Sequence, residues 1–122
     1  MTTRRIALLT TVLMLTLAGA AQAAVLVTPL FMALGTNDAD CTIVNVGNQP
    51  RTVTIDVVSS LGTVQESFTG LVNPGTIGLE FESNPGGSRY CRFTVEGGKQ
   101  TWRAAGCVFQ DNVGYIMCVP AQ

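Results

Sequence analysis

Few side chains of this 122-residue chain could do chemistry, and its four cysteines are the most informative of them. They are Cys41, Cys91, Cys107 and Cys118, separated by 50, 16 and 11 positions. A protein zinc or copper site needs closely spaced cysteine or histidine ligands, and this chain contains no histidine. An even number of widely spaced cysteines in a short chain instead predicts two disulfides and an oxidising compartment.

Other catalytic groups are poorly represented. Without histidine the serines lack the usual activating base, the Gly-x-Ser-x-Gly motif is absent, and Lys99, the only lysine, lies in a glycine turn. Glu80 and Glu82 share one face of an expected strand, where paired carboxylates ordinarily serve solubility. Asp38 and Asp40 share an expected loop that could offer oxygens to calcium, but it lacks the glycine and distal glutamate of an EF-hand. We predict no enzyme activity, no metal site and no cofactor.

Arginine and aromatic residues suggest one possible binding surface. Its members are Arg89, Tyr90, Arg92, Trp102 and Arg103, which could fall on adjacent strands. Such side chains suit contacts with sugars, carboxylates or proteins. The alternative, which we favour, places Trp102 in the core and lets the arginine stems cover a sheet.

The first 23 residues predict an export signal. Arg4 and Arg5 precede an uncharged apolar run of about 15 residues, and Ala21-Gln22-Ala23 supplies the small-x-small pattern of a cleavage site. The run is shorter than the roughly 20 residues that a membrane-spanning helix needs. We expect cleavage after Ala23 and a secreted or periplasmic mature chain, residues 24–122, without a stable membrane anchor.

The expected mature chain is small and slightly acidic. Loss of Arg4 and Arg5 leaves five basic and eight acidic side chains, a net charge of −3, with no basic cluster. This charge argues against nucleic acid or an anionic membrane as a partner. The length suits one domain with one modest core. We expect an unknown protein or a glycan as the partner.

Alternating apolar and polar residues predict short β-strands throughout this domain. In residues 89–96, Cys91, Phe93 and Val95 point one way and the polar residues point the other. Further strands are expected at 25–32 (at an edge or bulged, because of Pro29), 41–46, 52–57, 63–69, 77–82, 100–109 and 115–119. Seven or eight strands punctuated by Gly, Pro and Asn predict an antiparallel β-sandwich, with a closed barrel as the structural alternative.

Two of these strands need a choice of orientation. In 77–82 we expect Ile77, Leu79 and Phe81 to face the core. In 100–109, Trp102 and every second residue after it suit the core face of a regular strand. Cys107 and Phe109 suit the same core, but regular alternation would point them to the other face. A bulge near residues 104–106 would reconcile them, and we predict one there.

Hairpin geometry favours one of the three possible disulfide connectivities. If the last hairpin turns at residues 112–113, Cys107 lies directly opposite Cys118. The preceding Gly-Gly turn would place Cys91 three residues out of register with Cys107. We therefore predict Cys41–Cys91 and Cys107–Cys118.

A succession of motifs extends over about residues 40–110. They are Cys41-x-Ile43-Val44-Asn45-Val46-Gly47, Val53-Thr54-Ile55, Gly62, Asn73-Pro74-Gly75 and Cys91-Arg92-Phe93-Thr94-Val95. The succession resembles small secreted bacterial proteins of unassigned function that have an immunoglobulin-like β-sandwich. The resemblance implies that fold and a binding or structural role, and it carries no catalytic or ligand residue. Unlike antibody domains, the chain has no tryptophan midway between its first two cysteines.

These observations favour an exported, non-enzymatic β-sandwich with a binding or structural role. One alternative is a carbohydrate-binding module, which requires that Trp102, Tyr90 or Tyr115 be exposed. Another is a strand-exchanging subunit of a surface assembly, which requires an unpaired groove or a mobile segment such as 24–34.

Overall fold

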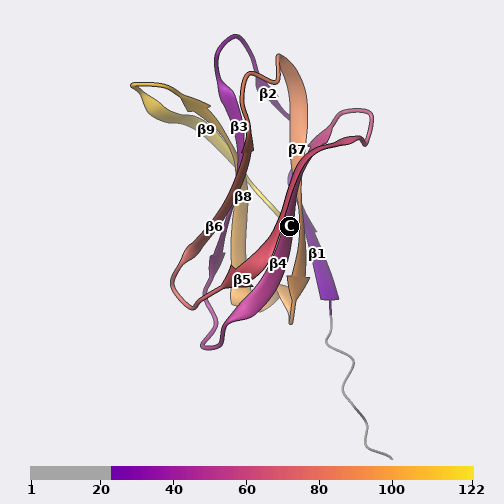
Figure 1. The fold of residues 1–122 in the computed structure, drawn as a ribbon, viewed down its shortest axis with the longest axis vertical. Coiled ribbons are helices and arrows are strands. Elements are labelled where there is room, and N and C mark those ends of the chain that lie inside the picture. The colour runs from indigo at the N-terminus through magenta and orange to yellow at the C-terminus, as the bar shows by residue number, and fades with distance from the viewer. Residues whose placement is uncertain (1–22) are drawn as a thin grey trace, which may run out of the picture.

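Two antiparallel β-sheets face each other in the computed structural model, which describes residues 23–122 (Figure 1). The prediction of an all-β antiparallel protein is confirmed, since the only helix in these residues is the short 3-10 helix η1, Lys99–Thr101. The predicted export signal lies outside the described residues, except for Ala23 at its end. Within 23–122, no helix has the length and apolar character needed to cross a membrane.

Sheet A has the strand order β1–β7–β4–β5, and β2 also pairs with β7. Its strands are β1 Ala23–Val27, β2 Phe31–Ala33, β4 Arg51–Ser59, β5 Val64–Val72 and β7 Gly87–Glu96. Together, β1 and β2 form one edge interrupted at Pro29, as predicted for this segment. Within the interruption, the Thr28 hydroxyl accepts a hydrogen bond from the Cys91 N–H at 2.9 Å, so the backbone stays attached to β7.

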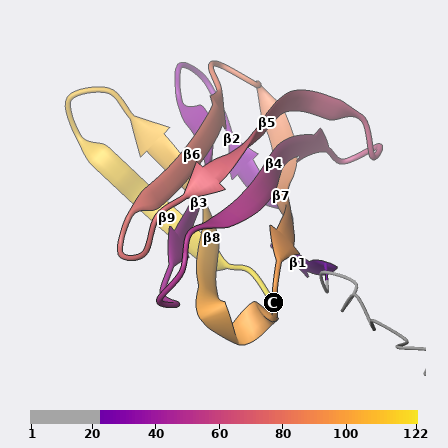
Figure 2. The ribbon, with the colours of Figure 1, turned by 60° about the horizontal axis from the view of Figure 1, so that its bottom comes forward.

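Sheet B has the order β6–β3–β8–β9. Its strands are β3 Asp38–Asn45, β6 Ile77–Glu82, β8 Trp102–Gln110 and β9 Gly114–Pro120. The chain leaves β7 in sheet A and enters β8 in sheet B through η1, which Figure 2 shows at the lower edge of the molecule. The Gly97-Gly98 turn therefore does not make a hairpin between 89–96 and 100–109, contrary to the prediction.

The core lies between the sheets and is built from alternate residues of their strands. Its most buried members include Val53, Ile55 and Val57 of β4, Cys91, Phe93 and Val95 of β7, and Cys41 and Ile43 of β3, none more than 1% exposed. Trp102 of β8 is 2% exposed, and its Nε1–H donates to the Glu96 carbonyl oxygen at 3.0 Å. Trp102 is thus a core residue with its polar atom satisfied.

The Asn45–Gly47 motif has a structural role. Asn45 is fully buried, and its Nδ2 donates to the carbonyl oxygens of Gln49 and Val72 at 2.8 and 2.9 Å. Its Oδ1 accepts the Gly47 N–H at 2.9 Å. One amide therefore joins the end of β3 to its own turn and to the end of β5, which satisfies backbone groups that would otherwise be buried unpaired.

The bulge predicted near residues 104–106 is wrong. β8 pairs with β3 without interruption, from Trp102 opposite Asn45 to Phe109 opposite Asp38. Trp102 and Val108 face the core, whereas Cys107 and Phe109 belong to the outer face of sheet B. The register shift occurs instead in the last hairpin, where Val108 pairs with Met117 and Phe109 with Tyr115.

Candidate binding surface

The orientation predicted for Ile77, Leu79 and Phe81 is wrong, and the error reveals the candidate site. These side chains are 68%, 45% and 47% exposed, because the intervening residues of β6, Gly78, Glu80 and Glu82, are the ones that face inward. At Gly78, a Cβ atom would lie only 3.2 Å from side-chain atoms of Ile43 and Val72. The glycine therefore allows β6 to approach the core closely while its apolar residues point outward.

The polar residues of β6 can face inward because this strand forms an edge of sheet B. Glu82 reaches across to Arg89 of sheet A, with Nε–Oε2 and Nη2–Oε1 distances of 2.6 and 3.0 Å. This ion pair connects the two sheets at the border of the core. The Glu82 hydrogen bonds and charge raise the pKa of Arg89 against the opposing effect of burial, so the guanidinium remains charged there.

Apolar side chains continue from β6 across the outer face of sheet B. The apolar residues on this outer face of sheet B are Ile77, Leu79 and Phe81 of β6, Val44 of β3, Ala105 and Phe109 of β8, and Tyr115 of β9. The Phe109 and Tyr115 rings meet edge to face with centroids 5.4 Å apart. Within residues 23–122, no further layer covers this surface.

The second disulfide, Cys107–Cys118, also lies on the outer face of sheet B. The two cysteines are opposite each other in β8 and β9, as predicted, with their Cα atoms 4.1 Å apart. Cys107 is only 3% exposed, whereas Cys118 is accessible to solvent. The bridge joins β8 to β9. The exposed residues Ile116 and Met117 lie between Cys118 and the hairpin turn.

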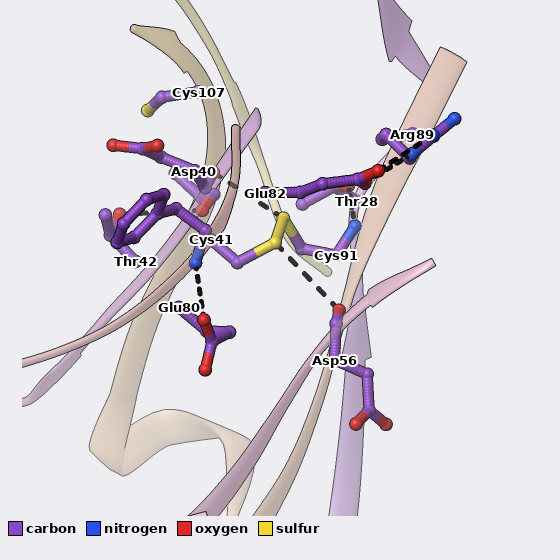
Figure 3. Close-up of a disulfide and its surroundings, with 12 residues drawn as sticks. Thr28, Asp40, Cys41, Thr42, Asp56, Glu80, Glu82, Arg89, Cys91 and Cys107 are labelled. Atoms are coloured by element: carbon purple, nitrogen blue, oxygen red, sulfur yellow. Dashed lines mark hydrogen bonds and ion pairs between the residues drawn. A yellow bond between two sulfur atoms is a disulfide. The ribbon is translucent and has the colours of Figure 1, made fainter. Parts of the chain in front are cut away.

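Two aspartates interrupt this apolar surface. Asp38 and Asp40 belong to β3, which begins at Asp38, rather than to the predicted loop. Asp40 is 6% exposed and lies beside Cys107 (Figure 3). Burial raises the pKa of Asp40, the Tyr115 hydroxyl lowers it in part, and the Asp38 charge raises it further. Within 23–122, no three Asp, Glu, Cys or His side chains are placed to hold a metal ion.

Replacing Asp40 with asparagine should stabilise the protein at neutral pH and have no such effect near pH 3. The raised pKa of Asp40 means that the folded state favours the protonated carboxyl. The stability that the protonated Asp40 carboxyl contributes is complete below its unfolded-state pKa and is lost as the pH rises through its folded-state pKa. Thermal denaturation of both proteins across this range is the measurement. A less stable variant at neutral pH would show that the contacts of the carboxylate outweigh its burial.

The arginine and aromatic residues predicted as a binding surface do not come together. Arg92 lies on the outer face of sheet A, where its Nε and Nη2 donate to Asp56 Oδ2 at 3.1 and 2.9 Å. Arg89 lies between the sheets, and Arg103 lies on the outer face of sheet B. Tyr90 is half-buried in β7, and Trp102 is in the core.

The Cys41–Cys91 disulfide lies at the centre of the molecule and joins the two sheets (Figure 3). Its pairing is as predicted, and both cysteines are fully buried. Gly106 of β8 packs against it, because a Cβ there would lie 3.0 Å from the Cys91 sulfur and would collide with the Phe31 ring. The buried bridge holds β3 against β7.

The outer face of sheet A has a different chemistry. Its exposed centre carries Thr52, Thr54, Thr69 and Thr94, and the Thr54 and Thr69 hydroxyls are 2.9 Å apart. Three of the four, Thr52, Thr54 and Thr94, line a shallow depression of about 290 Å³ beside Glu96. The centre of this face therefore offers hydroxyl groups, with Val25, Val27 and Leu71 exposed around them, whereas the outer face of sheet B offers more apolar side chains.

Comparisons with protein-family models, with curated proteins and with solved structures found no match to this chain. Evidence on function therefore comes from the surfaces of the molecule. Among them, the outer face of sheet B combines exposed apolar area with two acidic side chains at one end and Arg103 at the other. Of the residues that carry it, Tyr115 was predicted only as a candidate sugar-binding aromatic, and Ile77, Leu79, Phe81 and Phe109 were not predicted as a site.

Proposed function

We propose that this protein is an exported, non-enzymatic β-sandwich that binds another protein through the outer face of sheet B. The supporting observation is that three consecutive alternate residues of β6, Ile77, Leu79 and Phe81, point away from the core. Monomeric soluble proteins rarely leave a large contiguous apolar patch in water, and such patches are typical of interaction sites. Fixed strands carry the patch, so it is ready for a partner without rearrangement.

An immunoglobulin-like topology is part of this proposal. The disulfide joins β3 to β7, β3 pairs with β6, and β4 pairs with β7, as strands B, F, E and C do in immunoglobulin domains. The hairpin β4–β5 corresponds to C–C′. The edges differ, because β8 pairs with β3 where the immunoglobulin strand G would pair with F.

Export is supported by cysteine chemistry. All four cysteines are paired in two disulfides, which form and persist in oxidising compartments. The basic and apolar composition of residues 1–23 supports the same destination.

A patch variant with a matched control tests the proposed binding. Leu79→Lys places a charge on the outer face of sheet B, and Leu71→Lys does the same at a 64% exposed position on sheet A. Immobilised wild type and Leu71→Lys should retain the same partner from the exported fraction of the native cells, and Leu79→Lys should lose it. Equal retention by all three proteins, or no retention combined with no self-association, would overturn the proposal.

A glycan remains a second candidate because Tyr115 is 52% exposed beside Asp40. Exposed aromatic rings next to carboxylates can pack against and hydrogen-bond a sugar. A glycan array with wild type and Tyr115→Ala tests this function, and no Tyr115-dependent signal would exclude it. Strand exchange has less support, because β1 and β2, in the segment that this hypothesis would require to be mobile, pair with β7.

A further inference from the structure

We propose that the partner of the outer face of sheet B is a second copy of this chain, packed face to face about a two-fold axis. This inference rests on the proposed function and specifies its partner. It is carried by the distribution of charge on the apolar face, which is complementary to itself.

Opposite charges lie at the two ends of this face. Asp38 and Asp40 occupy one end of β3, while Arg103 lies opposite Val44 at the other end. The ion pairs within residues 23–122 are Arg89–Glu82 and Arg92–Asp56, so none includes these three side chains. Arg103 donates only to the carbonyl oxygens of Gln100 and Trp102.

The distance along the sheet prevents these charges from pairing within one chain. Val44 and Asp40 are four residues apart on β3, a separation of about 14 Å at the usual rise of a strand, and Asp38 is farther still. A second copy can bring them together. If it is inverted along the strands, its Arg103 lies against Asp38 of the first copy, and the reverse contact forms by symmetry.

The same two-fold operation matches the apolar residues. An axis across the strands, between the rows of Thr42 and Asp40, places β6 of one copy over β6 of the other. Ile77 of each copy then lies near Phe81 of the other. Two sheets stacked in this way pack about 10 Å apart with their strands within roughly 30° of each other, as sheets do inside sandwiches.

The size of the face suggests a weak dimer. Four strands at about 4.8 Å spacing and seven residues at about 3.4 Å give a face about 19 by 24 Å. That flat area, about 460 Å², is smaller than the roughly 800 Å² that each partner buries in a standard specific interface. Dimer formation should therefore depend on concentration.

Sedimentation equilibrium of the purified mature protein over a range of concentrations tests the inference. The mean mass of wild type and of Leu71→Lys should rise from one chain toward two. Leu79→Lys should weaken association about tenfold or more, since its ammonium would be buried in the apolar contact. Circular dichroism of each protein checks that the fold is unchanged. A wild type that remains monomeric at all concentrations would overturn the inference.

A charge exchange distinguishes the proposed geometry from nonspecific apolar association. Arg103→Asp and Asp38→Arg should each weaken the dimer, because each places like charges together. The double variant, Arg103→Asp with Asp38→Arg, should restore dimerisation, and a mixture of the two single variants should form heterodimers. Association unaffected by the charges would overturn the two-fold arrangement. If self-association is absent and capture still depends on Leu79, the second copy is excluded while protein binding stands. A lipid-vesicle control identifies the outcome in which a lipid surface occupies the face.

Discussion

Replacing Cys41 and Cys91 together by alanine should lower the free energy of unfolding by about 4 kcal/mol. The disulfide closes a loop between residues 50 positions apart, so its loss gives the unfolded chain much more conformational freedom. Both sulfurs are fully buried between β3 and β7, so the variant also loses packing at the centre of the core. Urea denaturation of the wild type and the double variant measures the difference.

The second disulfide supplies the matched comparison. Replacing Cys107 and Cys118 by alanine opens a loop between residues only 11 positions apart and should cost about 3 kcal/mol or less. This bridge lies on the outer face of sheet B, and its removal leaves the contact between the sheets intact. An equal or larger loss for this pair would contradict the view that Cys41–Cys91 holds the sheets together.

Trp102→Ala should destabilise the protein by about 3–5 kcal/mol, the cost typical of deleting a large buried aromatic side chain. Trp102 begins β8 directly opposite Asn45, so it closes one end of the core next to the buried amide that organises the β3 turn. The variant also leaves the Glu96 carbonyl oxygen without the indole donor. Chemical denaturation followed by circular dichroism is suitable, since it does not depend on the tryptophan signal.

Two further variants determine how much of this loss comes from packing. Trp102→Phe should lose less than Trp102→Ala, because it keeps an aromatic ring in the core but cannot donate to Glu96. Leu61→Ala, at a turn position that is 92% exposed, should change stability by less than about 0.5 kcal/mol. If Trp102→Ala behaved like Leu61→Ala, the packing described for this end of the core would be incorrect.

Alternation predicted the interior strands because those strands are covered on one face and hydrated on the other. Val53, Ile55 and Val57 lie inside, as do Cys91, Phe93 and Val95. The position assumed for the last turn placed Cys107 opposite Cys118, because a short hairpin determines which residues face each other. In these places local sequence and tertiary packing agree.

The rule that the apolar residues of an alternating strand face the core failed at β6. This strand is at the edge of its sheet, where inward polar side chains can find partners at the border of the core. Glu82 finds Arg89 at the border of the core, and Gly78 removes the side chain that would collide with Ile43. Ile77, Leu79 and Phe81 are then left on the outer face, whereas alternation alone assigns the apolar residues of a strand to the core. The sequence did contain a signal for this orientation, because Gly78 points to the same side of β6 as Glu80 and Glu82.

A similar error affected β8. The prediction assumed that every apolar side chain belongs to the core, so Cys107 and Phe109 seemed to require a bulge. The structure keeps one register and gives both residues to the outer face of sheet B. The candidate binding surface was thus missed for the same reason that two strand orientations were wrong. Residues that suit a core also suit an interface.

The pairing of distant strands has a consequence for the order of folding. β1 pairs with β7, so Ala23 meets Glu96, and β3 at the centre of sheet B pairs with β8. Neither sheet can close until the last third of the chain is present, and such nonlocal contacts make folding slow. A chain arriving from its N-terminus would keep β1 unpaired until β7 follows, and β3 could pair only with β6 until β8 follows. Such a chain stays incompletely folded until its C-terminal strands have arrived.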